Sequence, residues 1–412
     1  MIDQWLTRVM RGLTLRGAMR RATAIVAFGG LSALVMLPTA SYAADTLRPD
    51  VAKPLNAAQD LYRAHKYKDA LTKIAQAAAV PDKTPYENYM VEEMRGAAAI
   101  AAGDTGTAAQ AYETLLNSGK LTGEDEQRTS AALAGIYFQE KNYAKAIAVA
   151  QRYLKAGGAD PEMRVLLVQS YYLSNDCTSV VNQLKAGIDA EVRAGRTPDE
   201  SQLNLLGTCA QRVKDEATYR STLEKLVAYH PKPSYWDDLF QAIRSKPGYS
   251  SRLEVDMYRL RRATGSFASA DDYMQMTELS IVAGTTAEAK QVIDQGFTSG
   301  ALGHDAQADR EKRLQALAAK RAAAPVDKAN PVAPIDAGFN LVFAGQVKPG
   351  LAMMEDAIAK GGLDHPDEAQ LHLGVAYYVA GQKARALQVF HAVKGSDGSA
   401  DLARLWLLVA AK

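Results

Sequence analysis

Residues that build catalytic and metal centres are scarce in this sequence of 412 residues, which holds two Cys and six His. The His are scattered, with no H-E-x-x-H pair and no Cys–His spacing of a zinc site. There is no phosphate-binding Gly-Lys loop, no G-x-G-x-x-G turn after a strand and no G-x-S-x-G nucleophile elbow. The sequence therefore predicts no metal site, no cofactor and no catalytic residue, and we expect a protein that is not an enzyme.

Aromatic residues are also few, at 7%, whereas 48% of the residues are hydrophobic and many of these are Ala. Small apolar side chains let helices approach closely, and the apolar residues keep a helical period along most of the chain. We therefore expect an all-α protein.

An excess of positive charge is confined to the start of the chain. The first 43 residues hold five of the 48 basic residues and one of the 46 acidic residues, so the rest is slightly acidic. A partner such as nucleic acid or an anionic membrane would require a basic surface. We therefore expect no nucleic-acid partner.

The same N-terminal segment is typical of an export signal. Five Arg precede residues 22–44, which contain no charged residue, and Ser41-Tyr42-Ala43 places small residues at both recognition positions of a signal peptidase. We expect a Sec-type signal peptide at 1–43, cleavage after Ala43 and a periplasmic mature protein. The alternative is a segment retained as an inner-membrane anchor.

The stretch from Ala369 to Val393 carries the clearest motif. It places Leu373-Gly374 and Tyr377 on one helix and Ala386 and Phe390 on the next, with Gly381 at the turn between them. These residues and offsets resemble the tetratricopeptide repeat, in which small side chains lie where two helices cross and large ones fill the space beside them. The resemblance implies a repeated helix pair.

Related pairs recur from residue 55 to 411 at intervals near the 34 residues of this repeat. We predict a right-handed α-solenoid of about nine helix pairs. The predicted parts are a signal peptide at 1–43, a main array with a long additional helix at 44–322, a Pro-containing linker at 323–334, and a two-repeat unit with a capping helix at 335–412.

In the family, the first helix of each pair lines a concave face, and the resemblance implies which positions point into it. In the middle repeats these positions are polar and could bind an extended peptide or form a merely solvated wall. They are Arg128, Gln139, Gln169, Tyr172, Asn204, Thr208, Gln211, Arg212, Gln241 and Arg244. The outer repeat pair presents apolar residues instead, suited to a partner helix or to another part of the same protein. They are Phe339, Val342, Phe343, Leu371 and Tyr378.

Two further groups of residues leave alternatives open. Cys177 and Cys209 fall on helices expected to pack together, and in an oxidising compartment they form either a disulfide or two buried thiols. Arg252, Arg259, Arg261 and Arg262 cluster near the end of one helix, where they bind an acidic partner or stabilise the helix C-terminus before Gly265.

The resemblance to exported proteobacterial tetratricopeptide-repeat proteins implies a periplasmic scaffold that binds envelope proteins through its concave face, with a TonB-type energy-transducing complex as one such partner. The alternative is a binder of peptidoglycan or exported polysaccharide, or an accessory protein of an enzyme acting on them. A third expectation is self-association through apolar terminal faces.

Overall fold

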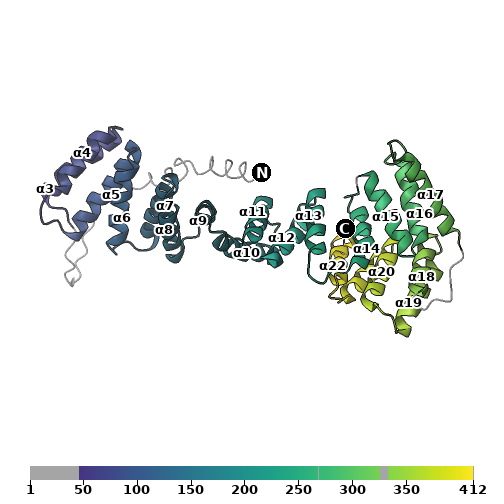
Figure 1. Cartoon of the computed structure of the whole chain (residues 1–412). Coiled ribbons are helices and arrows are strands. Elements are labelled where there is room, and N and C mark those ends of the chain that lie inside the picture. Colours follow the sequence, from purple (N-terminus) through teal and green to yellow (C-terminus); the bar gives the residue numbers. More distant parts are fainter. Residues whose placement is uncertain (1–45, 268, 325–332, 412) are drawn as a thin grey trace. The chain divides into compact units, whose positions relative to one another are not determined.

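The computed structural model describes residues 46–267, 269–324 and 333–411, and within them it contains helices and turns but no strand. The expected all-α fold of tetratricopeptide-type helix pairs is confirmed (Figure 1). The predicted signal peptide lies outside the described residues, as does most of the predicted linker. Among the described helices, none combines the length and the apolar character that crossing a membrane requires.

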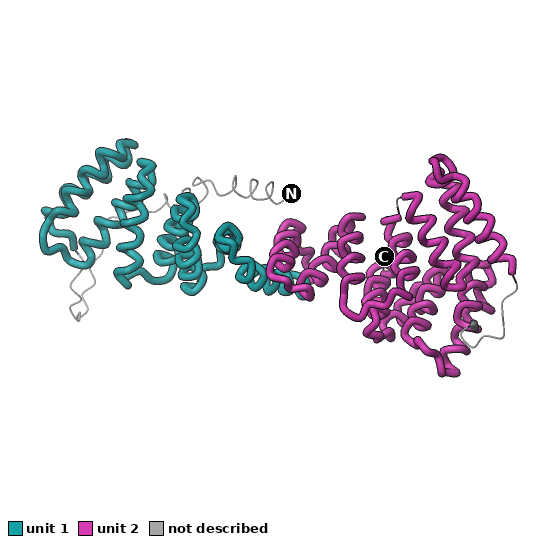
Figure 2. The backbone as a smooth tube through the Cα atoms, in the orientation of Figure 1, with its two compact units in different colours: residues 1–194 teal, residues 195–412 magenta. Residues whose placement is uncertain are grey.

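The chain divides into two compact units, residues 1–194 and 195–412 (Figure 2). In the first unit, four helix pairs follow one another. The helices are α3 (Pro49–Arg63), α4 (Tyr67–Ala78), α5 (Pro85–Ala102), α6 (Thr105–Asn117), α7 (Gly123–Gln139), α8 (Tyr143–Lys155), α9 (Pro161–Leu173) and α10 (Cys177–Arg193).

In its described residues, the second unit contains five helix pairs and two single helices, and the second helix of one pair is preceded by a short 3-10 turn, η1 (Ser251–Leu253). The helices are α11 (Glu200–Arg212), α12 (Glu216–Tyr229), α13 (Pro233–Arg244), α14 (Glu254–Ala263), α15 (Ala270–Val282), α16 (Thr286–Thr298), α17 (Ala308–Ala322), α18 (Ala333–Phe343), α19 (Val347–Lys360), α20 (Pro366–Val379), α21 (Lys383–Ala392) and α22 (Ser399–Ala410).

Local sequence sets where these helices begin. Several first helices start with Pro, whose fixed φ suits the first helical position and whose missing N–H costs nothing there. Several second helices start after an Asp or Asn whose side chain accepts a hydrogen bond from the backbone N–H three residues on. These caps are Asp104, Asn142, Asp176 and Asp215.

Glycine allows the two helices of a pair to touch. A Cβ on Gly96 would lie 2.5 Å from the ring of Tyr112, and a Cβ on Gly374 would lie 2.4 Å from the ring of Phe390. Both distances are far inside van der Waals contact, so only Gly fits against the aromatic ring. The motif residues of 369–393 therefore have the packing roles that the sequence predicted for them.

The division between the units differs from the expected one. The sequence predicted a boundary at the prolines of 323–334, but α18 packs against α16, and α22 packs against α14. The helices after the prolines thus belong to the same compact unit as those before them. The long additional helix expected in the main array is α17, which packs on α15 and α16 and buries Leu314 and Ala318 in their common core.

Candidate functional site

The first helices of unit 1 form an inner row. Neighbouring first helices contact each other, α3 with α5 and α7 with α9, and the second helices α4, α6 and α8 pack both on their own partner and on the next first helix. This arrangement places the exposed sides of α5 and α7 on one face of the unit, which we call the inner face.

Four of the predicted groove residues belong to this unit. Arg128 and Gln139 are exposed on α7, and Tyr172 is half-buried on α9. Arg128 donates to Asp125 one turn earlier in its own helix. Gln169 is an exception to the prediction, because its side chain has no exposed surface and a partner cannot reach it. The amide of Gln169 has no hydrogen-bond partner within the described residues.

A half-buried carboxylate on the inner face was not predicted. Glu93 lies on α5 near Tyr89 of the same helix and near Arg128 and Asp125 of α7. Burial raises the pKa of Glu93, the positive charge of Arg128 opposes this rise, and Asp125 adds to it. Glu93 accepts no hydrogen bond from the residues that the structure describes, so its carboxylate is available to an incoming donor.

In unit 2 the predicted groove residues already have partners within the chain or are exposed. Asn204 donates to the hydroxyl of Tyr235 (3.0 Å), and Thr208 donates to the carbonyl of residue 204 in its own helix (2.9 Å). The Arg244 guanidinium makes two hydrogen bonds to the Glu254 carboxylate, of 3.0 and 2.8 Å. The remaining three are exposed, namely Gln211, Arg212 and Gln241.

The apolar positions of the outer repeats are covered by the same chain. Phe339, Val342, Phe343 and Leu371 are each at most 8% exposed. The first three lie on α18, which packs against α16, and Leu371 lies on α20, which packs against α18. The guanidinium carbon of Arg259 on α14 lies 4.5 Å from the centre of the Phe339 ring. Of the two occupants that the sequence left open, a partner helix and another part of the protein, the structure supplies the second.

Arg259 is the centre of a buried charge network. Its guanidinium donates to both oxygens of Glu288 (2.6 to 3.0 Å) and to Asp256 (2.7 Å), and it also contacts His372 Nε2 (3.2 Å). His372 lies 3.1 Å from Asp256, and all four side chains are at most 7% exposed. Arg259 therefore neither binds an acidic partner nor simply caps its helix; it joins α14 to α16 and α20.

The contacts of this network shift the pKa values of His372 and Asp256. Burial alone would lower the pKa of His372, but the charge and hydrogen bond of Asp256 raise it above its ordinary value. Burial alone would raise the pKa of Asp256, but His372 and Arg259 lower it to about 2. The network is thus held together by charges that have no access to water.

Partly exposed ion pairs join the end of the chain to the middle of unit 2. The pairs are Arg404 with Glu224 (2.8 Å), Lys246 with Asp401 (2.6 Å) and Arg252 with Glu368 (3.2 Å). In addition, the backbone N–H of Ser250 donates a hydrogen bond to the carbonyl of Asp397 (2.8 Å). We call these contacts the C-terminal seam.

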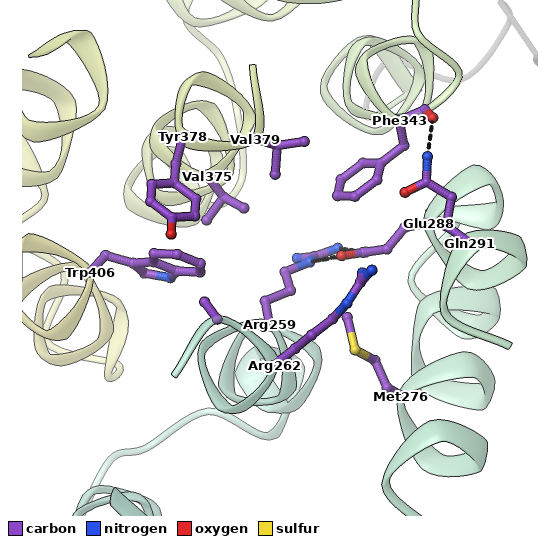
Figure 3. Close-up of a pocket in the computed structure, with 11 residues that line it drawn as sticks. Arg259, Arg262, Met276, Glu288, Gln291, Phe343, Val375, Tyr378, Val379 and Trp406 are labelled. Carbon is purple, nitrogen blue, oxygen red and sulfur yellow. Dashed lines mark hydrogen bonds and ion pairs between the residues drawn. The ribbon is translucent and has the colours of Figure 1, made fainter. Parts of the chain in front are cut away.

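A pocket of about 270 Å³ lies beside the network (Figure 3). One side is formed by Val375, Tyr378 and Val379 of α20 and by Trp406 of α22, and the opposite side by Phe343, Met276 and Gln291. Arg259 and Arg262 reach into it from α14 (Figure 3). The sequence gave no signal for this pocket, because its walls come from helices as far apart as α14 and α22.

Both cysteines are buried, Cys177 at the start of α10 and Cys209 within α11. Neither is a free thiol. Their pairing with each other stays a prediction, which thiol counting on the unfolded, unreduced protein tests. One disulfide would leave no free thiol, whereas two free thiols would contradict it.

The described residues contain no group of three or more His, Cys, Asp or Glu side chains that could hold a metal ion. They do contain one His in a charged network that sequence reasoning missed. His372 stands within the clearest repeat motif, and no pattern in the sequence distinguishes it from the five other His. Its partners Asp256 and Arg259 lie 116 and 113 residues away in the chain.

Two segments of the chain match the tetratricopeptide repeat family, residues 93–161 and 337–401. No curated protein matches the chain. Among solved structures, the chain is similar to a Naa15/Naa10 complex bound to HypK-THB, with 14% identity and a TM-score of 0.30, over 86% of this chain and 58% of that one. It thus spans less than two thirds of that relative.

Two further solved structures are similar over most of both chains. The TPR domain of P58(IPK) has 13% identity and a TM-score of 0.24, covering 88% of this chain and 97% of that one. Yeast Tom70 has 9% identity and a TM-score of 0.25, covering 88% and 95%. At these values the structural similarity carries no functional argument, and only the match to the repeat family bears on function.

Proposed function

We propose that this chain, which carries tetratricopeptide repeats in both of its compact units, is a non-enzymatic scaffold that binds protein partners in the bacterial periplasm. Tetratricopeptide repeats generally mediate protein–protein interaction, and matched repeats fall in each unit. Stacked helix pairs present a long surface, over which many weak contacts sum to useful affinity.

The observation that carries the proposal is the half-buried carboxylate of Glu93 on the inner face of unit 1. A carboxylate that is partly removed from water and accepts no hydrogen bond within the described residues gains most when a partner supplies a donor. Arg128 and Tyr89 lie near it and offer a cation and a hydroxyl to the same partner. An extended segment that carries both donors and acceptors fits this arrangement.

The periplasmic location rests on the N-terminal segment. Residues 1–43 combine a basic start, an uncharged stretch and small residues before the expected cleavage site after Ala43. Envelope proteins are the partners available in that compartment, and a TonB-type energy-transducing complex is one assembly among them. N-terminal sequencing of the exported protein tests the location, and a start other than Ala44 would contradict cleavage at this site.

Crosslinking in the native envelope followed by mass spectrometry tests the scaffold itself. We expect recovery of one or more envelope proteins and a decrease of roughly tenfold or more with Glu93→Gln, because a hydrogen bond to a charged group contributes about 1.5–3 kcal/mol. The matched control is Glu140→Gln, at the exposed C-terminal end of the neighbouring α7.

Three outcomes would contradict the proposal. Recovery of no protein partner at any salt concentration would argue against a scaffold. Sedimentation of the protein with peptidoglycan sacculi, undiminished by Glu93→Gln, would instead favour the alternative of a peptidoglycan or polysaccharide binder or an enzyme accessory protein. Light scattering that reports a dimer would assign the surface to self-association.

A further inference from the structure

The pocket of unit 2 combines an apolar interior with an excess of positive charge. Phe343, Val375, Tyr378 and Val379 supply apolar surface from two helices, and Val379 is 45% exposed at the edge of the pocket. A volume of about 270 Å³ corresponds to roughly nine water molecules at their share of liquid volume. It lies just below the usual range for ligand pockets, so the occupant is small.

The two arginines of the pocket differ in what they are free to bind. Arg259 is saturated, because its donors go to Glu288, Asp256 and Thr285. Arg262 makes one hydrogen bond within the described residues, from Nη2 to the neutral amide oxygen of Gln295 (2.6 Å). The charge of Arg259 is thus neutralised inside the protein, whereas no carboxylate pairs with Arg262 in the part of the chain that the structure describes.

One residue that lines this pocket, Trp406, has an unused hydrogen-bond donor. The indole Nε1–H of Trp406 is buried and has no hydrogen-bond partner in the described part of the chain, although the residue is only 2% exposed. The ring itself is fixed by Phe390, stacked at 5.8 Å, and by Tyr378 at 5.0 Å between ring centres. Buried indole N–H groups usually find an acceptor, so this one marks a place where an acceptor is missing.

We propose that this pocket binds a small apolar carboxylate, with the carboxylate paired to Arg262 and the apolar body packed among Phe343, Tyr378 and Val379. Arginine is suited to this role because its planar guanidinium matches a carboxylate with two parallel hydrogen bonds. The same chemistry is offered by a free aliphatic acid and by the C-terminal residue of a polypeptide. The residues of the pocket differ from those of the inner face of unit 1. The proposal of a carboxylate site is therefore independent of the proposal that the protein is a scaffold.

Isothermal titration calorimetry on the full mature chain tests the ligand class. The probes are octanoate, 1-octanol and octylammonium, which share an apolar body and differ in charge. We expect octanoate to bind at least tenfold more tightly than octanol, and octylammonium not to bind. A comparison of N-acetyl-leucine with its amide distinguishes the two sources of the carboxylate, a free acid and a polypeptide C-terminus. If N-acetyl-leucine binds more tightly than octanoate and its amide does not, the natural ligand is a polypeptide C-terminus. If octanoate binds more tightly than N-acetyl-leucine, the natural ligand is a free acid.

Two substitutions locate the site, each with a matched control in the same unit. Arg262→Gln should weaken octanoate binding about tenfold and leave octanol binding unchanged, because it removes one charge-assisted hydrogen-bonding group. Arg313→Gln, an exposed position on α17, makes the same change of charge away from the pocket. Val379→Asp should abolish octanoate binding by placing a like charge at the edge, whereas Val282→Asp should not, since Val282 is 86% exposed at the end of α15.

Three results would overturn the proposal. One is equal affinity for octanoate and octylammonium. Another is octanoate binding that neither Arg262→Gln nor Val379→Asp reduces. The third is no heat of binding for any of the acids at millimolar concentration. Circular dichroism of each variant shows that its helices are intact, so that loss of binding is assigned to the pocket.

Discussion

The two compact units use the same helix pair in different ways. Unit 1 stacks four pairs and leaves its inner face open, with a half-buried carboxylate at Glu93 that accepts no hydrogen bond within the described residues. In unit 2, charged side chains of the same kinds pair with one another inside the unit. The buried network consists of Arg259, Asp256, Glu288 and His372. One motif thus leaves an exposed face in the first unit and forms an internal joint, the buried network, in the second.

The difference shows that a charge on a repeat helix has no fixed role. Arg128 and Arg259 are both helix arginines paired with an Asp three residues earlier. Arg128 is 41% exposed and Arg259 is 2% exposed. Later helices cover Arg259, which helps to hold the fold together, whereas Arg128 stays exposed.

The largest expected effect comes from breaking the joint of unit 2. Arg259→Met leaves Asp256 and Glu288 buried without their cation and should lower the free energy of unfolding by about 3–5 kcal/mol. The matched change in unit 1, Arg128→Met, removes an exposed pair and should cost about 0–1 kcal/mol. Urea denaturation followed by circular dichroism measures both.

Hydrogen exchange then locates the Arg259 effect. Amides of α14, α16 and α20 should lose protection in Arg259→Met, while those of α3 to α8 keep it. Equal loss across both units would contradict the assignment of the network to unit 2 alone. Adding Asp256→Asn and Glu288→Gln should restore part of the stability, since neutral side chains no longer require the cation.

Filling the helix crossings should affect both units alike. Gly96→Ala and Gly374→Ala each drive a methyl group into an aromatic ring and should destabilise the protein by about 1–3 kcal/mol. Gly135→Ala has the opposite sign, with a gain of about 1 kcal/mol, because no atom lies within 4 Å of the new Cβ and Ala favours the helix. Thermal unfolding of the three variants measures the contrast, and a stabilised Gly96→Ala would show that the crossing is looser than described.

Both units should lose stability in acid, and unit 2 should also lose stability in alkali. The hydrogen bonds of Arg48 lower the pKa of Glu87 from 4.5 to about 2, so its stabilisation of unit 1 is present above pH 4.5 and lost as the pH falls towards 2. The pKa of His372 is raised above 6.5, so its stabilisation of unit 2 is complete below pH 6.5 and lost as the pH rises through the folded-state pKa.

Urea midpoints between pH 3 and 9 compare the wild type with two variants. Glu87→Gln should flatten the acidic side of the profile, and His372→Gln the alkaline side. Asp256, whose pKa is also lowered to about 2, leaves some acid sensitivity in Glu87→Gln. An alkaline side that His372→Gln does not change would show that the His372–Asp256 contact does not titrate with folding.

The smallest expected effect concerns the C-terminal seam. Arg404→Gln removes the partly exposed pairs to Glu224 and Asp401 and should cost up to about 1 kcal/mol at low salt. The cost should fall further at 1 M salt, where screening shortens the reach of exposed charges to about 3 Å. Urea denaturation at the two salt concentrations measures this loss of stability. A loss of several kcal/mol would mean that the C-terminal seam is less accessible to water than the exposure of its side chains indicates.

Much of the fold could be predicted from the sequence, because a helix pair is encoded locally. The apolar period, the small residue at the crossing and the aromatic ring four residues after Ala386 all lie within one repeat. Nine pairs, a long helix after the seventh and a final helix around Trp406 were therefore foreseeable. The predicted groove residues lie on first helices of their pairs, and their role in binding stays a prediction. Gln169 is buried, and side chains such as Asn204 and Arg244 already bind within the chain.

The joint and the pocket could not be predicted, since a repeat pattern shows which side of a helix is apolar but not what covers it. Phe339 and Leu371 were recognised as exposed in an isolated array and required an occupant. The occupant, α14 with Arg259, lies before the prolines, on the far side of the expected domain boundary. The pocket was missed for a related reason, because its residues run from Arg259 to Trp406 and so come from both sides of the prolines.

The C-terminal seam also orders events in time during folding. In unit 1 the ion pair of Arg48 with Glu87 spans 39 residues, so each pair can form soon after its neighbour has been made. In unit 2 the bond from Arg404 to Glu224 spans 180 residues, and the one from Lys246 to Asp401 spans 155. Unit 1 can therefore be complete while the chain is still emerging, whereas the apolar faces of α20 and α21 that pack on α22 are covered only once this last helix has been made. A chain that is truncated before α22 would expose those faces. Synthesis of the last dozen residues is therefore the step after which the nascent protein no longer exposes this aggregation-prone surface.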